Sequence, residues 1–247
     1  MKLLVAIVLS MGFAFAEPLE DMSCEAIFHA WLAKNRGDQK GYDVYVKTAI
    51  QTLKDGANPL GSCRYLFSEI RGQVFSNSST PYELAIQLSV MPVIKFIFEE
   101  MKISPQQLYP GGWGAPINSL PCDVKVVKYF LDKGLDPNYV AKDTKGQPRI
   151  DSFLEPLVLK YTAPIAFTKK EEDRIRKQCK DAIELVLKRG GDPNAPVSTT
   201  GSTVLHLLEK ENDPYNMYEL FVKHGAREDI KNIKGYTPRD LYYGKAK

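Results

Sequence analysis

Histidine, tryptophan and cysteine are scarce in this chain, and their scarcity narrows the classes of function that the sequence can support. Among 247 residues there are three histidines, two tryptophans and four cysteines. The histidines are scattered, and no two cysteines form a Cys-x-x-Cys pair, so the ligand spacing of a zinc or thiol redox site is missing. No His-Glu-x-x-His helix and no Ser/His/Asp set can be recognised. The sequence therefore predicts a protein that is not an enzyme and that holds no cofactor or metal.

The chain also lacks a large excess of positive or negative side chains. Lys and Arg total 33 and Asp and Glu total 30, which leaves a formal net charge of +3. Nucleic-acid-binding proteins normally carry a strong basic excess or a basic stripe, so we expect no nucleic-acid partner. Beyond the N-terminal segment no apolar run approaches the ~20 residues of a membrane-spanning helix. We therefore expect no membrane insertion once that segment is removed.

The N-terminal segment holds the one long apolar run of the sequence. Lys2 precedes an almost unbroken apolar stretch at 3–15, and Ala14-Phe15-Ala16 has the small-x-small form of a signal-peptide cleavage site. The pattern predicts a signal peptide at residues 1–16 and a mature chain of residues 17–247. We expect this chain to be exported, to a bacterial periplasm or out of the cell. The alternative is an N-terminal anchor that is retained.

A short turn sequence recurs at the ends of apolar segments. Its copies contain Gly56, Gly134, Gly190 and Gly225, and Pro and Asn follow closely in the first three. A glycine just past a helix end can take the left-handed conformation that closes the last carbonyl groups. Asn, Asp and Pro then continue the turn. Each copy therefore predicts the end of a helix.

Apolar residues stand seven, four and three positions before these glycines, which places them on one helical face. They are Val127, Phe130 and Leu131 before Gly134; Ile183, Val186 and Leu187 before Gly190; and Tyr218, Phe221 and Val222 before Gly225. The Gly56 copy is the weakest, and another copy lacks glycine but keeps Ile94, Ile97 and Phe98 before Met101. We expect these faces to be buried.

A second recurring element opens another helix in each unit. Thr80-Pro81 and Thr237-Pro238 place a capping Thr before a Pro at the first helical position. Ala115-Pro116 and Thr203-Val204 are variants of this opener. The chain is therefore predicted to repeat a unit of two helices.

These features together resemble the ankyrin-repeat family, which has a Thr-Pro-Leu-His-like opener, a second helix ending before Gly-Ala and a period near 33 residues. Thr203–Leu207 with Gly225-Ala226 is the closest copy. The resemblance implies an all-α fold, an ankyrin-repeat solenoid of about five to six stacked helix pairs with enlarged fingers. It covers residues 17–247, with irregular units to about residue 114 and clearer repeats at 115–247.

The fingers, which are the connections between one helix pair and the next, depart from the regular period. Gly134 and Gly190 are 56 residues apart, and part of the excess forms a long finger at 139–150. The rest contains Thr168 and Glu171 in the spacing of a capping box. We therefore predict a helix from Lys169 to about Lys188 whose charged first half projects beyond the stack.

Ankyrin-repeat proteins bind other proteins and catalyse no reaction of their own, so the resemblance implies a protein partner. We expect a monomer that acts as an inhibitor or immunity protein in the periplasm. The alternatives are a secreted effector that binds host proteins and an envelope scaffold for oxidative-stress defence. The sequence does not name the partner.

The candidate partner-binding residues all lie in the expected fingers. Trp113 either packs locally or anchors a partner. The other candidates are Tyr139, Lys142, Asp143 and Lys145 in the long finger, and Val197 and Thr199 in the next one. His206 occupies the histidine position of the opener, and the resemblance implies that it ties the helix start to a neighbouring turn.

An even number of cysteines in an exported chain permits two disulfides, and four cysteines allow three pairings. Cys122 lies 12 residues before Gly134 and Cys179 lies 11 before Gly190, so they occupy the same corner of adjacent units. We predict a Cys122–Cys179 bond, with Cys24–Cys63 as the second. Helices pack 8–10 Å apart whereas disulfide Cα atoms lie within about 7 Å, so the corner must narrow locally.

Overall fold

The computed structural model describes residues 18–63, 79–103, 120–138, 154–164, 166, 168–197 and 200–244. The chain divides into two compact units, Met1–Pro81 and Tyr82–Lys247, and each is described by itself. The predicted signal peptide lies outside the described residues. Within the described ranges the regular structure is helical, and the β-type pairing is the isolated bridge between Pro196 and Thr203.

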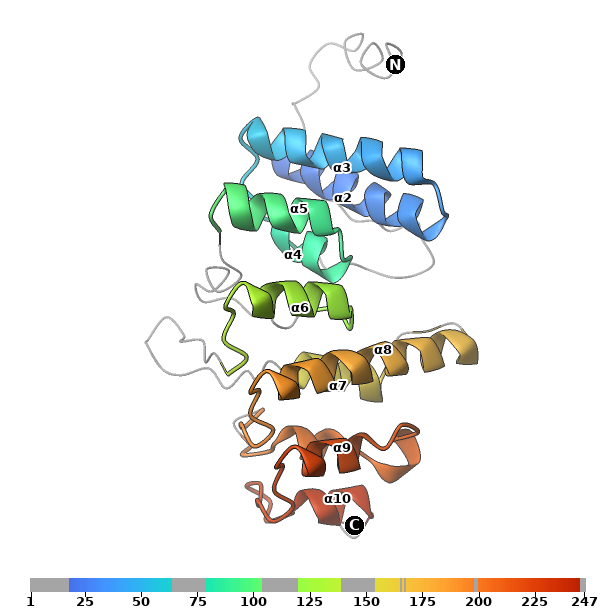
Figure 1. Ribbon diagram of the computed structural model, residues 1–247, viewed down its shortest axis with the longest axis vertical. Helices are drawn as coiled ribbons and strands as arrows, with labels where there is room; N and C mark the ends of the chain where they lie inside the picture. The colour runs from blue at the N-terminus through green and yellow to red at the C-terminus, as the bar shows by residue number, and fades with distance from the viewer. Residues whose placement is uncertain are drawn as a thin grey trace. The chain divides into compact units, whose positions relative to one another are not determined.

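The first unit contains a helical hairpin. Helix α2 (Leu19–Asn35) and helix α3 (Gln39–Lys54) are joined by a tight turn, and Figure 1 shows them side by side. Asp38 ends the turn by accepting a hydrogen bond from the Gly41 amide at 2.8 Å, which caps α3. The Cys24–Cys63 disulfide ties α2 to the segment that follows α3.

The second unit repeats pairs of helices. Its elements are α4 (Pro81–Gln87), α5 (Met91–Lys95), a π-helical turn (Phe96–Glu100), α6 (Val124–Asp132), α7 (Glu155–Thr162), α8 (Lys169–Lys188), 3-10 helices at Val204–Leu207 and Lys210–Asn212, α9 (Met217–Lys223) and α10 (Pro238–Tyr242). Helix α8 contacts both α6 and α7, so neighbouring pairs share one core. Pro81 and Pro238 stand at the starts of their helices, as the openers predicted.

The predicted apolar faces are buried with one clear exception. Phe130, Ile183 and Phe221 are each 1% exposed or less, and their partners in α6 and α8 are also buried. Val222 is 37% exposed, so its predicted burial is wrong. Helix α8 packs against α6, whereas among the described residues no second helix follows α10 to pack against α9 in the same way.

The four predicted glycine turns adopt one geometry. Gly56, Gly134, Gly190 and Gly225 have φ angles of 113°, 86°, 89° and 89°. In each turn the amide of the residue after the glycine donates to the carbonyl of the residue four positions before the glycine. The Leu135 amide, for example, donates to the Phe130 carbonyl at 3.0 Å. This bond closes the helix end, which explains why glycine recurs at this position.

The copy without glycine ends differently from the others. A π-helical turn precedes it, with the Met101 amide bonded to the Phe96 carbonyl, and this adds one residue to the helix. The left-handed position therefore falls on Lys102, with φ of 59°, and not on Met101 as the alignment of the copies indicated. A side chain in this conformation is strained, because its Cβ approaches the following carbonyl oxygen.

Replacing Lys102 by glycine is expected to raise the free energy of unfolding by about 1 kcal/mol, since glycine adopts positive φ without that clash. Lys102 is exposed, so few contacts are lost. Urea denaturation followed by circular dichroism measures the change. The matched control is Gly134→Ala, which introduces the same strain at φ of 86° and should lower stability by a similar amount. Equal stability of Lys102→Gly and the parent would contradict this reasoning.

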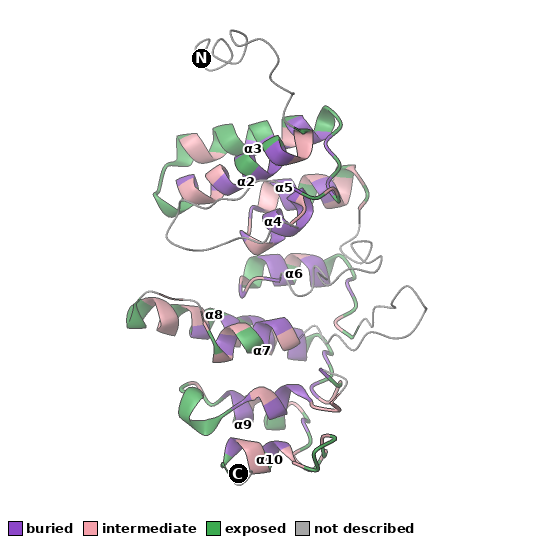
Figure 2. Ribbon diagram, turned by 180° about the vertical axis from the view of Figure 1, so that it is seen from behind, coloured by how far each residue is buried: buried purple, intermediate pink, exposed green. Residues whose placement is uncertain are grey.

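Helix α8 has the predicted bounds, and the Thr168 hydroxyl caps it by accepting from the Glu171 amide at 3.2 Å. Figure 2 shows that its N-terminal end is largely exposed. The middle of the helix is covered by the segment 209–216. Arg176 is 5% exposed and donates to the Asn212 carbonyl at 2.7 Å, and Lys180 donates to the Tyr215 carbonyl at 2.9 Å.

A buried carboxylate at Asp213 organises this segment. Asp213 is 6% exposed and accepts hydrogen bonds from the Tyr161 hydroxyl at 2.6 Å and the Tyr242 hydroxyl at 3.1 Å. It also accepts from the amides of Met217 at 2.7 Å and Tyr218 at 2.9 Å, which caps the first turn of α9. One side chain thus joins α7, α9 and α10. Hydrogen bonding to Asp213 adds to burial in raising the pKa of Tyr161.

Candidate partner-binding surface

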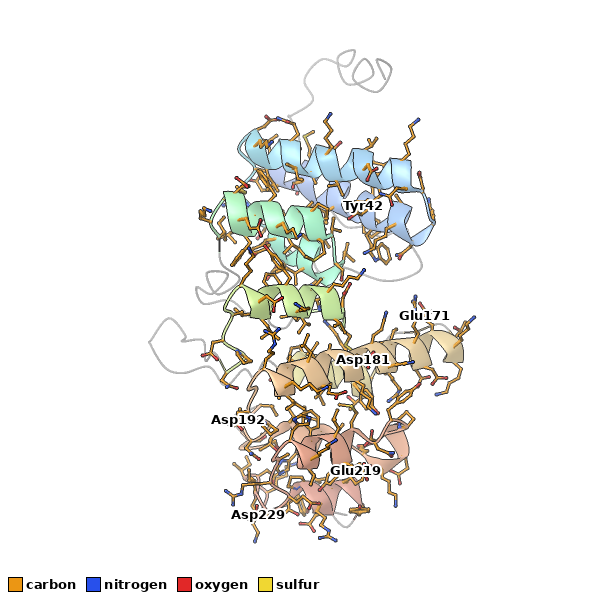
Figure 3. All side chains as sticks on the ribbon, viewed as in Figure 1. Tyr42, Glu171, Asp181, Asp192, Glu219 and Asp229 are labelled. Atoms are coloured by element: carbon orange, nitrogen blue, oxygen red, sulfur yellow. A yellow bond between two sulfur atoms is a disulfide. The ribbon has the colours of Figure 1, made fainter. Side chains whose placement is uncertain are left out.

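The fingers of the second unit lie at one end of its helices. Figure 1 shows the turns after α6, α8 and α9 on the same side, and Figure 3 places Asp192 and Asp229 there, with Glu171 at the opposite end of α8. All three turns follow the glycine-closed helix ends, so the local sequence sets where each finger begins.

An asparagine side chain ties each of two fingers to the next turn along the chain. Asn138 donates through Nδ2 to the Gly190 carbonyl at 2.7 Å and accepts through Oδ1 from the Asp192 amide at 2.7 Å. Asn194 makes the same two bonds with the turn after α9, at 2.9 and 2.8 Å. Each amide satisfies a donor and an acceptor of its neighbour, so the bases of these fingers are held in register.

His206 joins the bases of the last two fingers. Its Nδ1 accepts from the Thr203 amide at 2.9 Å, which leaves Nε2 to donate to the Tyr236 carbonyl at 3.2 Å. Burial lowers the pKa of the imidazole below its usual range, so His206 is neutral near pH 7 and can fill both roles. The residue therefore has the structural role that the ankyrin resemblance implied.

The outer ends of the last two fingers form a continuous patch. We call it the tip surface, and it comprises Thr200, Ser202, Asn232, Ile233, Lys234 and Tyr236. The Ile233 amide donates to the Thr200 carbonyl at 2.8 Å, which joins the two fingers. A hollow of about 350 Å³ lies between the polar members and Leu241. Ile233 is 73% exposed, more than any other large hydrophobic residue that the structure describes.

An exposed isoleucine on a braced turn has the properties of a binding anchor. Its backbone is already fixed, so a partner that covers it gains apolar burial without ordering the loop. The polar residues around it supply the hydrogen-bonding rim that interfaces carry.

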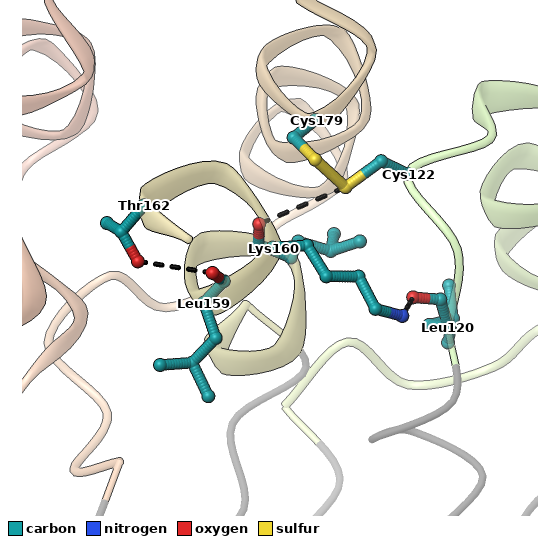
Figure 4. Close-up of a disulfide and its surroundings, with 7 residues drawn as sticks. Leu120, Cys122, Leu159, Lys160, Thr162 and Cys179 are labelled. Carbon is teal, nitrogen blue, oxygen red and sulfur yellow. Dashed lines mark hydrogen bonds between the residues drawn. A yellow bond between two sulfur atoms is a disulfide. The ribbon is translucent and has the colours of Figure 1, made fainter. Parts of the chain in front are cut away.

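A second, apolar hollow lies where α7 and α8 meet the segment before α6. We call it the inner hollow. It has a volume of about 680 Å³ and is lined by Gln87, Ser89, Pro121, Cys122, Asp123, Pro156, Leu159, Lys160, Ala163, Pro164, Ile175 and Gln178. Figure 4 shows Leu159 and Lys160 on α7 beside the Cys122–Cys179 disulfide. Leu159 is 47% exposed, so apolar surface remains open here.

Lys160 is the basic residue of this hollow. Its ammonium donates to the Leu120 carbonyl, and burial lowers its pKa to about 8. Because the local environment is largely apolar, the charged form is disfavoured relative to water. The lysine is still mostly charged at pH 7.

Most of the partner-binding residues predicted from the sequence lie outside the described residues. They are Trp113, Tyr139, Lys142, Asp143, Lys145 and Thr199. Val197 is described, but it is 3% exposed, and its amide donates to the Ser202 carbonyl at 2.8 Å. Its side chain packs inside the finger, so little of it is left for a partner to contact.

Sequence reasoning missed Ile233 and Leu159. Ile233 is an apolar residue between Asn232 and Lys234 inside a finger, and that isolation was a usable signal. Leu159 gave no such signal, because it stands in the apolar run Pro156–Leu159 and reads as a core position.

Both predicted disulfides are present. Cys24 pairs with Cys63 at a Cα–Cα distance of 6.4 Å, and Cys122 pairs with Cys179 at 4.4 Å. The Cys122–Cys179 bond does not require two helices to approach more closely than usual. Cys122 precedes α6, and this segment can approach α8 more closely than a helix could.

The part of the chain that the structure describes contains no group of three or more His, Cys, Asp or Glu side chains arranged to hold a metal ion. Within the same residues, no helix is both long enough and apolar enough to cross a bilayer.

Comparisons with known proteins place these features in one fold. No protein-family model matches the chain. It is 30% identical over 115 residues to the ankyrin repeat protein FPV031 of Fowlpox virus (strain NVSL), which covers 47% of this chain and 27% of the viral protein. The chain thus spans about a quarter of the length of that curated relative.

Two solved structures share the fold at 15% identity. One is the ankyrin repeat domain of Bcl-3, a member of the IkappaB family, with a TM-score of 0.50 over 94% of this chain and 96% of that one. The other is the human ASB11 ankyrin repeat domain, with a TM-score of 0.55 over 93% of each chain.

Proposed function

This chain is an ankyrin-repeat protein, and we propose that it binds one protein partner through the tip surface, since the ankyrin-repeat fold generally mediates protein–protein binding. The observation that carries the proposal is the exposure of Ile233, at 73%, on a finger whose backbone is tied to its neighbour. A partner that covers a large apolar side chain at a fixed position gains its apolar burial without the cost of ordering the loop.

We propose further that the chain acts outside the cytoplasm, as an inhibitor or immunity protein of the periplasm. Two features support an oxidising compartment: the apolar run before Ala14-Phe15-Ala16, and two disulfides that use all four cysteines. An inhibitor suits the fold, because braced fingers can cover an active site without reordering.

A second candidate function is an effector that binds host proteins after secretion. It is favoured by the similarity to a viral ankyrin repeat protein. Cell fractionation separates the two, because an inhibitor of the periplasm stays in that fraction whereas an effector appears in the medium or in host cells. An envelope scaffold for oxidative-stress defence predicts instead a deletion strain with increased peroxide sensitivity.

Replacing Ile233 by aspartate is expected to weaken partner binding at least ten-fold, which corresponds to ~1.4 kcal/mol. The partner is first captured with the chain 17–247 from an extract and identified, and its affinity is then measured by surface plasmon resonance. The matched control is Val124→Asp, which changes another exposed apolar residue, 36% exposed, on α6. Unchanged affinity in Ile233→Asp, or equal losses in both variants, would remove the tip surface as the binding site.

A further inference from the structure

We propose that the inner hollow is a binding site for a small monocarboxylate with an apolar body, whose carboxylate pairs with the Lys160 ammonium. This site goes beyond the proposed protein-binding function, and neither proposal depends on the other.

The first support is a largely buried cation without a counter-ion. Among the described residues, the Lys160 ammonium has one hydrogen-bond partner, the Leu120 carbonyl, and no carboxylate within ion-pair distance. Figure 4 shows the side chain extending toward Leu120 beside the disulfide. An ammonium carries three donors, so two remain for a ligand. Buried charges in proteins are normally paired, and an anion bound here would supply the missing partner.

The second support is the chemistry of the walls. Six lining residues are aliphatic or proline: Pro121, Pro156, Leu159, Ala163, Pro164 and Ile175. The volume of about 680 Å³ falls in the range of small-molecule sites, which are mostly apolar with a few polar groups that set orientation. The half-exposed Leu159 side chain would lose its contact with water when the apolar body binds.

The remaining charge at the hollow limits the ligand to one carboxylate. Asp123 is the other ionisable side chain among the described lining residues, since the disulfide removes Cys122 from titration. Its carboxylate accepts from the Lys125 amide at 2.9 Å and caps α6, so its position is fixed. A second carboxylate on the ligand would be repelled, whereas Gln87 and Gln178 are neutral.

The direct test uses 4-phenylbutyrate as the probe, with the full chain and its disulfides intact. Titration calorimetry at pH 7 should show binding, and two-dimensional NMR should place the shifted amides in α7, at 120–123 and around Gln178. The neutral isostere 4-phenylbutanamide, which keeps the apolar body and loses the charge, is expected to bind at least ten-fold more weakly. Glutarate, which has two carboxylates and little apolar surface, should not bind.

Substitutions of Lys160 test whether its charge is needed for ligand binding and not for folding. Lys160→Met is expected to lose at least ten-fold in affinity for 4-phenylbutyrate and to melt no lower than the parent, because a buried unpaired charge is removed. Lys160→Arg keeps the charge and should retain affinity within about three-fold of the parent. The matched control is Lys177→Met on α8, an exposed lysine outside the hollow, which should leave binding unchanged.

Affinity should also fall as the pH rises from 7 to 10. The probe stays ionised in this range, whereas Lys160, whose pKa burial lowers to about 8, loses its charge. Because binding favours the ammonium form, affinity is expected to begin to fall near the pKa of Lys160 in the free protein, about 8, and to level off near its higher pKa in the complex.

Three results would overturn the proposal: equal affinity for the acid and its amide, unchanged affinity in Lys160→Met, or shifted amides that map away from the hollow. The proposal would also be overturned if a peptide with an apolar C-terminal residue bound at the hollow and no free acid did. That result would mark the hollow as part of the protein interface. None of these outcomes alters the expected effect of Ile233→Asp at the tip surface.

Discussion

Replacing Asp213 by alanine is expected to lower the free energy of unfolding by about 3–5 kcal/mol, the largest effect of any single substitution proposed for this chain. The carboxylate accepts four hydrogen bonds, two from tyrosine hydroxyls and two from amides of α9. Alanine would leave these donors unpaired, and a buried donor without a partner costs about 1–3 kcal/mol. Guanidinium denaturation of the parent and the variant gives the difference directly.

Single tyrosine variants provide the control for Asp213. Tyr161→Phe and Tyr242→Phe each remove one donor and leave the carboxylate bonded to the α9 amides, so each should cost about 1–3 kcal/mol. Tyr161→Phe should cost more, because its hydroxyl also accepts from the Tyr215 amide at 3.2 Å. A loss in Asp213→Ala no larger than in either tyrosine variant would contradict the view that Asp213 joins three helices.

Removing the Cys122–Cys179 disulfide is expected to lower stability by about 2–4 kcal/mol. The bond closes a segment with a sequence separation of 57, which includes all of α6 and α7. Without the bond the unfolded chain gains the conformational freedom of that segment, so the folded state becomes less favourable. The measurement is denaturation of the Cys122→Ser/Cys179→Ser double variant under non-reducing conditions.

Hydrogen exchange locates the effect of the lost disulfide. Amides of α6 and α8 should exchange faster in the double variant, whereas the parent should reach the same rates only after reduction. The matched control is Cys24→Ser/Cys63→Ser, whose bond lies in the first unit, and it should speed exchange in α2 and α3. Disulfide mapping of the parent by mass spectrometry must give these two pairs, because any other pairing contradicts the structure.

The regular part of the fold could be predicted because it depends on local chemistry. The bounds of α8 follow from Thr168 as the cap and from the glycine turn after Lys188, and both signals lie within a few residues of the helix ends. The glycine turns and the buried faces of α6 and α8 were predictable for the same reason. Val222 could not be judged in this way, because its exposure depends on whether another helix covers it.

Features that depend on distant contacts could not be predicted. Nothing in the sequence near Asp213 shows that Tyr161, 52 residues earlier, donates to it. The π-helical turn before Met101 likewise moved the left-handed residue by one position, and no residue pattern announces such a turn. The sequence predicted that fingers would form the candidate site, but it did not predict which residues would be exposed there. The exposed anchor is Ile233, whereas Val197 is buried.

The asparagine bridges at Asn138 and Asn194 have a consequence for how such a chain can diversify. Each bridge fixes where a finger leaves the stack, so the outer part of a finger can change in length or sequence while the helices beneath it keep their spacing. Loop grafting at these positions should therefore preserve folding as long as the two asparagines remain. The chain could in this way serve as a scaffold for engineered recognition loops.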